Sequence, residues 1–161
     1  MTISKRERGF TLLELLVVVG LIAMMAAVVA VALTTARGKG GDAGVKSNLH
    51  TIANQAELFM SANSSYLPSG GSTFSIATCP VYNAGGTNML SKDQVIADAV
   101  AQAANNGGNG SSCYNSSSAW AVAVGLKSSP TVSWCIDNSG ASKQVSSAPS
   151  SAINGTTFLC N

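Results

Sequence analysis

Few side chains in this 161-residue sequence are placed to do chemistry, and the most unusual of them is Glu14. This carboxylate lies at the start of a run that carries no charge from Leu15 to Leu33. An ionised side chain inside a membrane helix costs about 2.5 kcal/mol or more, depending on depth, so such residues usually have a partner and a function. The other interpretation places Glu14 near the membrane interface, where it reaches the headgroups or is protonated. The sequence therefore predicts either an ion-pairing site or an interfacial residue.

The other candidates for catalysis or metal binding do not form a recognisable set. His50 is the only histidine, and we interpret it as a solvated residue beside the apolar face of a helix. Asp93 and Asp98 lie five positions apart on a predicted surface helix, a spacing typical of solvated acids. The sequence has no C-x-x-C motif, and one histidine gives no zinc pattern. We predict no catalytic residue, no metal site, no cofactor and no enzymatic activity.

The element that must position Glu14 is the apolar stretch from Gly9 to Leu33. Its uncharged part has about the 20 residues that a helix needs to cross the hydrocarbon core of a bilayer. Its many valines favour a strand in water, but in lipid only a helix satisfies its own backbone hydrogen bonds within one segment. Basic residues that precede such a helix stay in the cytoplasm, and here they are Lys5, Arg6 and Arg8. We expect a transmembrane helix over residues 10–36, with the C-terminal part of the chain outside the cytoplasm.

Residues 5–14, Lys-Arg-Glu-Arg-Gly-Phe-Thr-Leu-Leu-Glu, resemble the class III signal of type IV prepilins and pseudopilins. The pattern consists of a short basic leader, Gly9 before the cut, Phe10 after it, and an acid, Glu14, at the fifth mature position. The resemblance is specific over residues 5–36 and looser to about Pro68. It implies that residues 1–9 are a cytoplasmic leader, that a prepilin peptidase cuts between Gly9 and Phe10, and that Phe10 is N-methylated. An uncleaved signal anchor would satisfy the hydropathy alone; a secretory signal fits less well, because no A-x-A site follows the run.

This resemblance implies a structural subunit that polymerises into a type IV pilus-like filament on the cell surface. Its partners are then other copies of the chain, the prepilin peptidase, a membrane assembly platform and, before assembly, membrane lipid. Glu14 of one subunit would meet the Phe10 amine of its neighbour, which balances a buried charge and sets the register. Two alternatives stay open. One is a pseudopilin of a type II secretion system or a minor pilin, and the other is a monomeric, membrane-anchored binding module.

Charge separates the leader from the rest of the chain. The formal net charge of the whole sequence is +2, and the leader alone accounts for it through Lys5, Arg6 and Arg8 against Glu7. The mature chain from Phe10 onward is therefore neutral. Nucleic-acid binding depends on clustered Lys and Arg, so we predict no nucleic-acid partner. Residues 37–161 are expected to form one extracytoplasmic domain.

Two features are expected in the segment that follows the apolar run. Residues 37–44 contain four glycines, which cost about 1 kcal/mol each relative to Ala inside a helix. Either the chain breaks here or packing forces one continuous helix, as the resemblance implies. After Gly44, apolar residues recur at spacings of three and four and predict a helix whose apolar face packs on a sheet. This face consists of Val45, Leu49, Ile52, Ala56, Phe59 and Met60.

The C-terminal half carries one helix signal and then strand signals. A capping box at Ser91–Gln94 predicts a helix over 92–105, and Asn105-Asn106-Gly107-Gly108 supplies the stop. Strands are predicted over 120–126 and 131–136, followed by a turn at 137–140. Further short strands are predicted over 141–146 and 156–160. We therefore predict an α+β, pilin-like fold in which a long N-terminal helix, transmembrane in its first half, packs on a small antiparallel sheet.

All four cysteines lie outside the apolar run, at Cys79, Cys113, Cys135 and Cys160. Under the expected topology they leave the reducing cytoplasm, so disulfides are predicted, and four cysteines allow three connectivities. We favour Cys79–Cys113 and Cys135–Cys160, because each pair fastens one variable loop to itself or to the sheet. The second pair also corresponds to the C-terminal disulfide loop that the resemblance implies.

Overall fold

The structure is a computed structural model that describes residues 9–161. The charged residues of the predicted leader, Lys5, Arg6, Glu7 and Arg8, lie outside the described residues. The chain divides into two compact units, Met1–Arg37 and Gly38–Asn161. We call the second unit the head and describe each unit by itself.

Helix α1 covers Leu12–Asn63 without interruption, so the glycines at 38–44 do not break it. Two of these glycines are sites of close packing within the head. A Cβ at Gly41 would lie 2.7 Å from the Asn106 carbonyl oxygen, and one at Gly44 would lie 2.7 Å from Asn106 Nδ2. Packing against helix α3 (Gln94–Gly107) therefore overcomes the low helix propensity of glycine at these positions.

The carboxylate of Asp42 fixes the same part of α1 to the loop after β3. The backbone N–H of Lys127 donates to Asp42 Oδ1 at 2.6 Å, and that of Ser128 donates to the same oxygen at 3.2 Å. The Ser128 hydroxyl donates to the other oxygen, Oδ2. Asp42 is buried, and these three donors replace the water that its charge would otherwise need.

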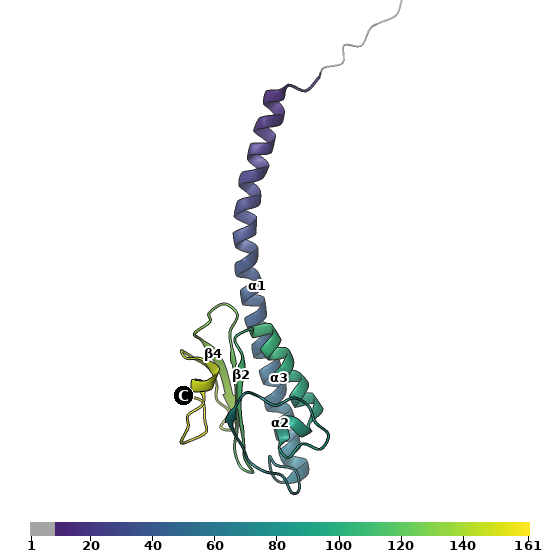
Figure 1. The fold of residues 1–161 in the computed structure, drawn as a ribbon, viewed down its shortest axis with the longest axis vertical. Helices are drawn as coiled ribbons and strands as arrows, with labels where there is room; N and C mark the ends of the chain where they lie inside the picture. Colours follow the sequence, from purple (N-terminus) through teal and green to yellow (C-terminus); the bar gives the residue numbers. More distant parts are fainter. Residues whose placement is uncertain (1–8) are drawn as a thin grey trace, which may run out of the picture. The chain divides into compact units, whose positions relative to one another are not determined.

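The head contains a five-stranded antiparallel sheet whose strands follow one another in chain order, β1-β2-β3-β4-β5 (Figure 1). Helix α3 lies alongside the second half of α1. A short helix, α2, precedes α3, and another, α4, follows the sheet. The strands are β1 (Phe74–Ala77), β2 (Ser111–Asn115), β3 (Trp120–Gly125), β4 (Ser133–Asp137) and β5 (Ser142–Val145), and the shorter helices are α2 (Met89–Lys92), α3 (Gln94–Gly107) and α4 (Pro149–Ala152).

The two faces of β3 explain its alternating sequence. Trp120, Val122 and Val124 enter the main core, together with the apolar face of α1. Ala121 and Ala123 enter a second cluster on the other face, under the C-terminal segment. Large side chains therefore fill the space beneath a helix, whereas alanines leave room for a loop. Of the predicted face of α1, four residues are completely buried and Phe59 and Met60 are partly buried.

Helix α3 begins two residues later than its sequence signal indicates. Asp93, not Ser91, is the N-cap, and its side chain accepts from the Ile96 N–H at 3.0 Å. The residues before it form α2, which Asn88 caps by accepting from the Ser91 N–H. The stop at the other end is confirmed, since Gly108 is the C-cap with φ +84°, a conformation that favours glycine.

The strand predictions were partly right. The strands at 120–126, 131–136 and 141–146 are present as β3, β4 and β5. β1 and β2 were not predicted: β2 is mostly polar, and β1 is a piece of only four residues in a stretch rich in Gly, Ser and Asn. The strand predicted over 156–160 is wrong: that segment contributes only an isolated bridge between Ile153 and Cys160. Its backbone instead turns around Asn154, whose side chain accepts from the Thr156 and Thr157 N–H groups.

Candidate processing and assembly segment

The predicted cleavage junction precedes the first turn of α1. Gly9 and Phe10 are exposed and not helical, and the Phe10 side chain is 79 % exposed. A Cβ at Gly9 would meet no described atom within 4 Å. An exposed, irregular backbone is what a peptidase needs at a cleavage site.

Thr11 and Glu14 form a reciprocal cap at the start of α1. The Thr11 N–H and the Thr11 hydroxyl both donate to Glu14 Oε2 at 3.0 Å. In return, the Glu14 N–H donates to the Thr11 hydroxyl oxygen at 3.2 Å. This is a capping box, in which a Thr and a Glu three residues later satisfy each other's backbone donors. Our sequence reasoning did not identify it, although Thr-Leu-Leu-Glu carries its signature.

The cap gives Glu14 a definite direction. Its carboxylate points back toward residue 11, at the end of the chain where the junction lies, and not onward along the helix. Negative charge near a helix N-terminus is also favourable for the helix dipole. The Glu14 carboxylate is therefore held at Thr11, which is the residue next to Phe10. Phe10 is the other residue predicted for assembly.

Every residue from Gly9 to Arg37 is exposed, although most of them are apolar. Among the described residues, α1 is the single helix long and apolar enough to cross a membrane. Exposed leucine, isoleucine, valine and methionine side chains on this scale require a covering phase, which is lipid or other protein. The segment thus has the makeup of an N-terminal membrane anchor with an accessible junction before it.

Comparison with protein families identifies this segment more closely. Residues 4–30 match the family model described as the prokaryotic N-terminal methylation motif, which is the class III signal of type IV pilins and pseudopilins. The match supports a type IV pilin-like or pseudopilin subunit in general. Such proteins are structural and usually non-enzymatic. A long apolar N-terminal helix with an antiparallel sheet is also a pilin-like, α+β architecture.

Outside this motif, the comparisons add nothing further: no curated protein and no solved structure gives a significant match. The conclusions for the head therefore depend on its own geometry.

Two disulfides join the cysteines in the pairs that we favoured. Cys79–Cys113 has an S–S distance of 2.07 Å and links the segment after β1 to β2. Cys135–Cys160 has an S–S distance of 2.02 Å and links β4 to the C-terminal segment. Asp137 reinforces the second link, since its Oδ2 accepts from the Cys160 N–H at 2.8 Å. Such bonds persist in oxidising compartments and suit a protein that leaves the cytoplasm.

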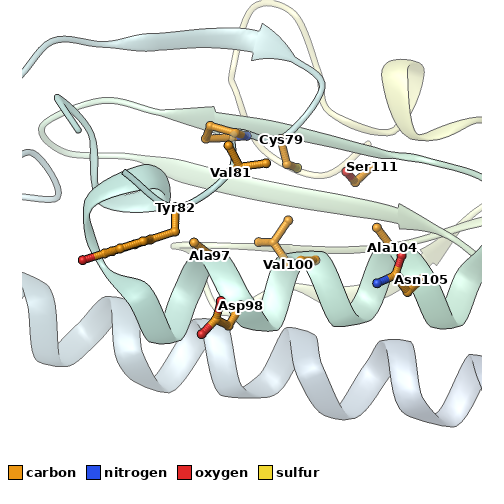
Figure 2. A pocket seen from close by; sticks show the side chains of 11 residues that line it. Cys79, Val81, Tyr82, Ala97, Asp98, Val100, Ala104, Asn105 and Ser111 are labelled. Atoms are coloured by element: carbon orange, nitrogen blue, oxygen red, sulfur yellow. The ribbon is translucent and has the colours of Figure 1, made fainter. Parts of the chain in front are cut away.

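A cavity of about 320 Å³ lies between the loop after β1 and helix α3 (Figure 2). Cys79, Val81 and Tyr82 form one wall, and α3 forms the other. Asp98 points away from the loop in this view, and the lining is mostly apolar. Within residues 9–161, no group of three or more His, Cys, Asp or Glu side chains is arranged to hold a metal ion. His50 is exposed on α1.

A second cavity of about 380 Å³ lies between α1 and the turn after β4. Glu57 lines it, and its Oε1 accepts from the Tyr66 hydroxyl at 2.9 Å. Burial, together with this hydrogen bond and the nearby negative charge, raises the pKa of Tyr66 above its ordinary value. The Tyr66 ring meets Trp120 edge-on, with 6.4 Å between the ring centroids. Trp120 Nε1 is the one buried side-chain polar atom without a hydrogen-bond partner in the described part of the chain.

Proposed function

We propose that this chain is the structural subunit of a type IV pilus-like filament. The observation that carries the proposal is the match of residues 4–30 to the methylation motif, on a helix whose apolar surface is exposed over residues 12–37. Before assembly, lipid covers residues 10–36, and the head lies outside the cytoplasm. During assembly, other copies replace the lipid.

Processing prepares the subunit for this exchange. A prepilin peptidase removes residues 1–9, and the new N-terminus, Phe10, is methylated. Cleavage adds a cationic amine at Phe10, next to the residue that already binds the Glu14 carboxylate. In a bundle of parallel helices, Glu14 of one subunit then pairs with the Phe10 amine of its neighbour. Removing one partner of a buried ion pair leaves the other charge uncompensated. The pair therefore favours the axial register in which the two charges meet.

The head supplies the filament surface. It has its own packed core and two disulfides. The membrane assembly platform would extract the subunit through the apolar segment and leave the folded head unchanged.

Mass spectrometry of the N-terminus of sheared surface material tests this proposal. We expect filaments whose main subunit begins with methylated Phe10. A mature protein that still begins with Met1 would overturn the proposal. Fractionation separates the alternatives, because a pseudopilin of a type II secretion system stays in the periplasm, a minor pilin is scarce in the filament, and a monomeric anchored module stays with the membranes.

A further inference from the structure

Three charged side chains of the head lie on one narrow face of α1. Lys39 and Lys46 are seven residues apart, and Glu57 follows Lys46 by eleven. At 3.6 residues per turn these separations are about two and three whole turns, so the three residues share one side of the helix. The face is therefore basic at its start and acidic at its end. Lys39 and Glu57 are exposed.

The acidic end is a cavity built from polar groups. The lining of the 380 Å³ cavity includes the carboxylates of Glu57 and Asp137 and the amides of Asn54 and Asn138. Neutral groups satisfy both acids: Tyr66 donates to Glu57, and the N–H groups of Ser139 and Cys160 donate to Asp137. These donors orient the two carboxylates but leave two negative charges at one cavity without a cation among the hydrogen-bond donors.

The two lysines at the basic end differ. Lys46 Nζ lies 4.2 Å from the centroid of the Trp134 ring, a cation–π contact that holds it on its own subunit. Lys39 is two turns nearer the N-terminus and fully on the exposed side of the helix. Of the two, Lys39 is the side chain able to reach another molecule without giving up a contact.

We propose that Lys39 of a second copy of this chain enters the cavity beside Glu57. The two copies are parallel and shifted along the helix axis by 18 residues, or about 27 Å. An ammonium group has three donors, and the exposed Glu57 carboxylate, whose Oε1 accepts from Tyr66, is the acceptor that it meets. This contact rests on the proposed function, because it requires parallel copies in a filament. Its offset of 18 residues differs from the offset of four residues at the Phe10–Glu14 pair, so it joins a different pair of neighbouring copies.

Carbodiimide cross-linking of intact sheared filaments tests the contact directly. The reagent joins an amine to a carboxylate without a spacer, and Lys39 and Glu57 of one chain are too far apart along α1 to react with each other. We expect mass spectrometry to find a Lys39–Glu57 peptide from two subunits. Lys39→Arg keeps the charge but not the reactive amine, so this variant should form filaments and lose the cross-link.

Charge reversal gives an independent measurement. We expect Lys39→Glu and Glu57→Lys each to reduce filament number about tenfold, and the double variant to restore most of it. Lys143→Glu, on an exposed residue of β5, is the matched control and should leave filament number unchanged.

The two proposals fail in different ways. If the wild-type chain forms no filaments, the proposed function and this contact are both wrong. If filaments form but Glu57 cross-links only to Lys46 or to no lysine, and Lys39→Glu assembles normally, the contact alone is wrong.

Discussion

The two regions of the chain, before and after position 38, differ in whether their apolar side chains are exposed or buried. From Gly9 to Arg37 every residue is exposed, although the segment is mostly apolar. From Gly38 to Asn161 most large apolar side chains form two packed clusters, and two disulfides link the segment after β1 and the C-terminal segment to the sheet. The first region depends on its surroundings for stability, whereas the head carries its stabilising contacts inside itself.

This difference separates folding from assembly. Apart from Lys39 and Glu57 at the proposed contact between copies, substitutions in the head should change the free energy of unfolding, and substitutions at the start of α1 should change the number of filaments. If a substitution in one region changes the property assigned to the other region, the two regions are coupled.

Glu14→Ala should abolish filaments while leaving processing intact. Losing one partner of a buried ion pair typically costs about 3–5 kcal/mol, which corresponds to a factor of 100 or more at each contact. Filaments in the sheared fraction are counted, and N-terminal mass spectrometry checks cleavage after Gly9. Asp98→Ala, on α3 of the head, is the control and should assemble. Normal filament numbers in Glu14→Ala would refute the assembly role of this residue.

Replacing both Cys135 and Cys160 by Ser should be the largest change in the head. The bond closes a loop across a sequence separation of 25 residues. Restricting the unfolded chain in this way contributes about 3–4 kcal/mol to the free energy of unfolding. Denaturant titration of the detergent-solubilised chain measures the loss, with Ser61→Ala on the exposed side of α1 as control. An unchanged midpoint would mean that Asp137 and the C-terminal packing hold this segment without the bond.

Asp42→Ala should lower the free energy of unfolding by about 2–3 kcal/mol, because it leaves two backbone N–H groups and one hydroxyl without their acceptor. Asp42→Asn keeps one oxygen acceptor and should lose less. The same titration measures both variants. Equal losses would show that the negative charge of Asp42, and not the hydrogen bonds, matters at this loop.

Two neighbouring glycines of α1 should respond in opposite directions. Gly40 has open space around it, so Gly40→Ala should stabilise the head by about 0.5–1 kcal/mol through helix propensity. A Cβ at Gly41 would lie 2.9 Å from Lys127 Cδ and closer still to Asn106, so Gly41→Ala should destabilise it by about 1–3 kcal/mol. Thermal unfolding compares the pair. If both variants raise the thermal stability, the close packing at Gly41 relaxes to accept the added Cβ.

The smallest effect is expected from Tyr66 at high pH. Its raised pKa means that the folded head favours the neutral phenol. This contribution is complete below about pH 10 and is lost as pH rises through the folded pKa, by no more than about 1.4 kcal/mol per pH unit. Tyr66→Phe cannot ionise here and should flatten this part of the stability curve. An identical alkaline slope in both proteins would assign the loss to other groups.

The parts of the fold that follow from periodicity were predictable from the sequence. Spacings of three and four place Val45, Leu49 and Ile52 on one face of α1, and all three are completely buried. Alternation of large and small side chains predicts β3, since one face of the strand carries Trp and Val and the other carries Ala. Both disulfide pairs are the favoured ones, and Cys135–Cys160 also agrees with the C-terminal loop that the resemblance implies.

The rest depends on contacts between distant residues. β2 has the sequence Ser-Ser-Cys-Tyr-Asn, which shows little strand preference, yet pairing with two neighbours buries most of it. Asn115, its last residue, is buried because its Oδ1 accepts from the Met89 N–H at 2.9 Å. At the candidate site, the position of Glu14 was predictable, and the capping box was readable in principle from Thr11 three residues before it.

The glycines within α1 also have a mechanical consequence. Residues 38–44 span about 10 Å as a helix and about 24 Å when extended. Asp42 and the packing at Asn106 hold the helical length, while the intrinsic preference of glycine opposes it. Under tension, we expect this stretch to give way before the sheet does, so that each subunit lengthens and absorbs a pull without losing its fold.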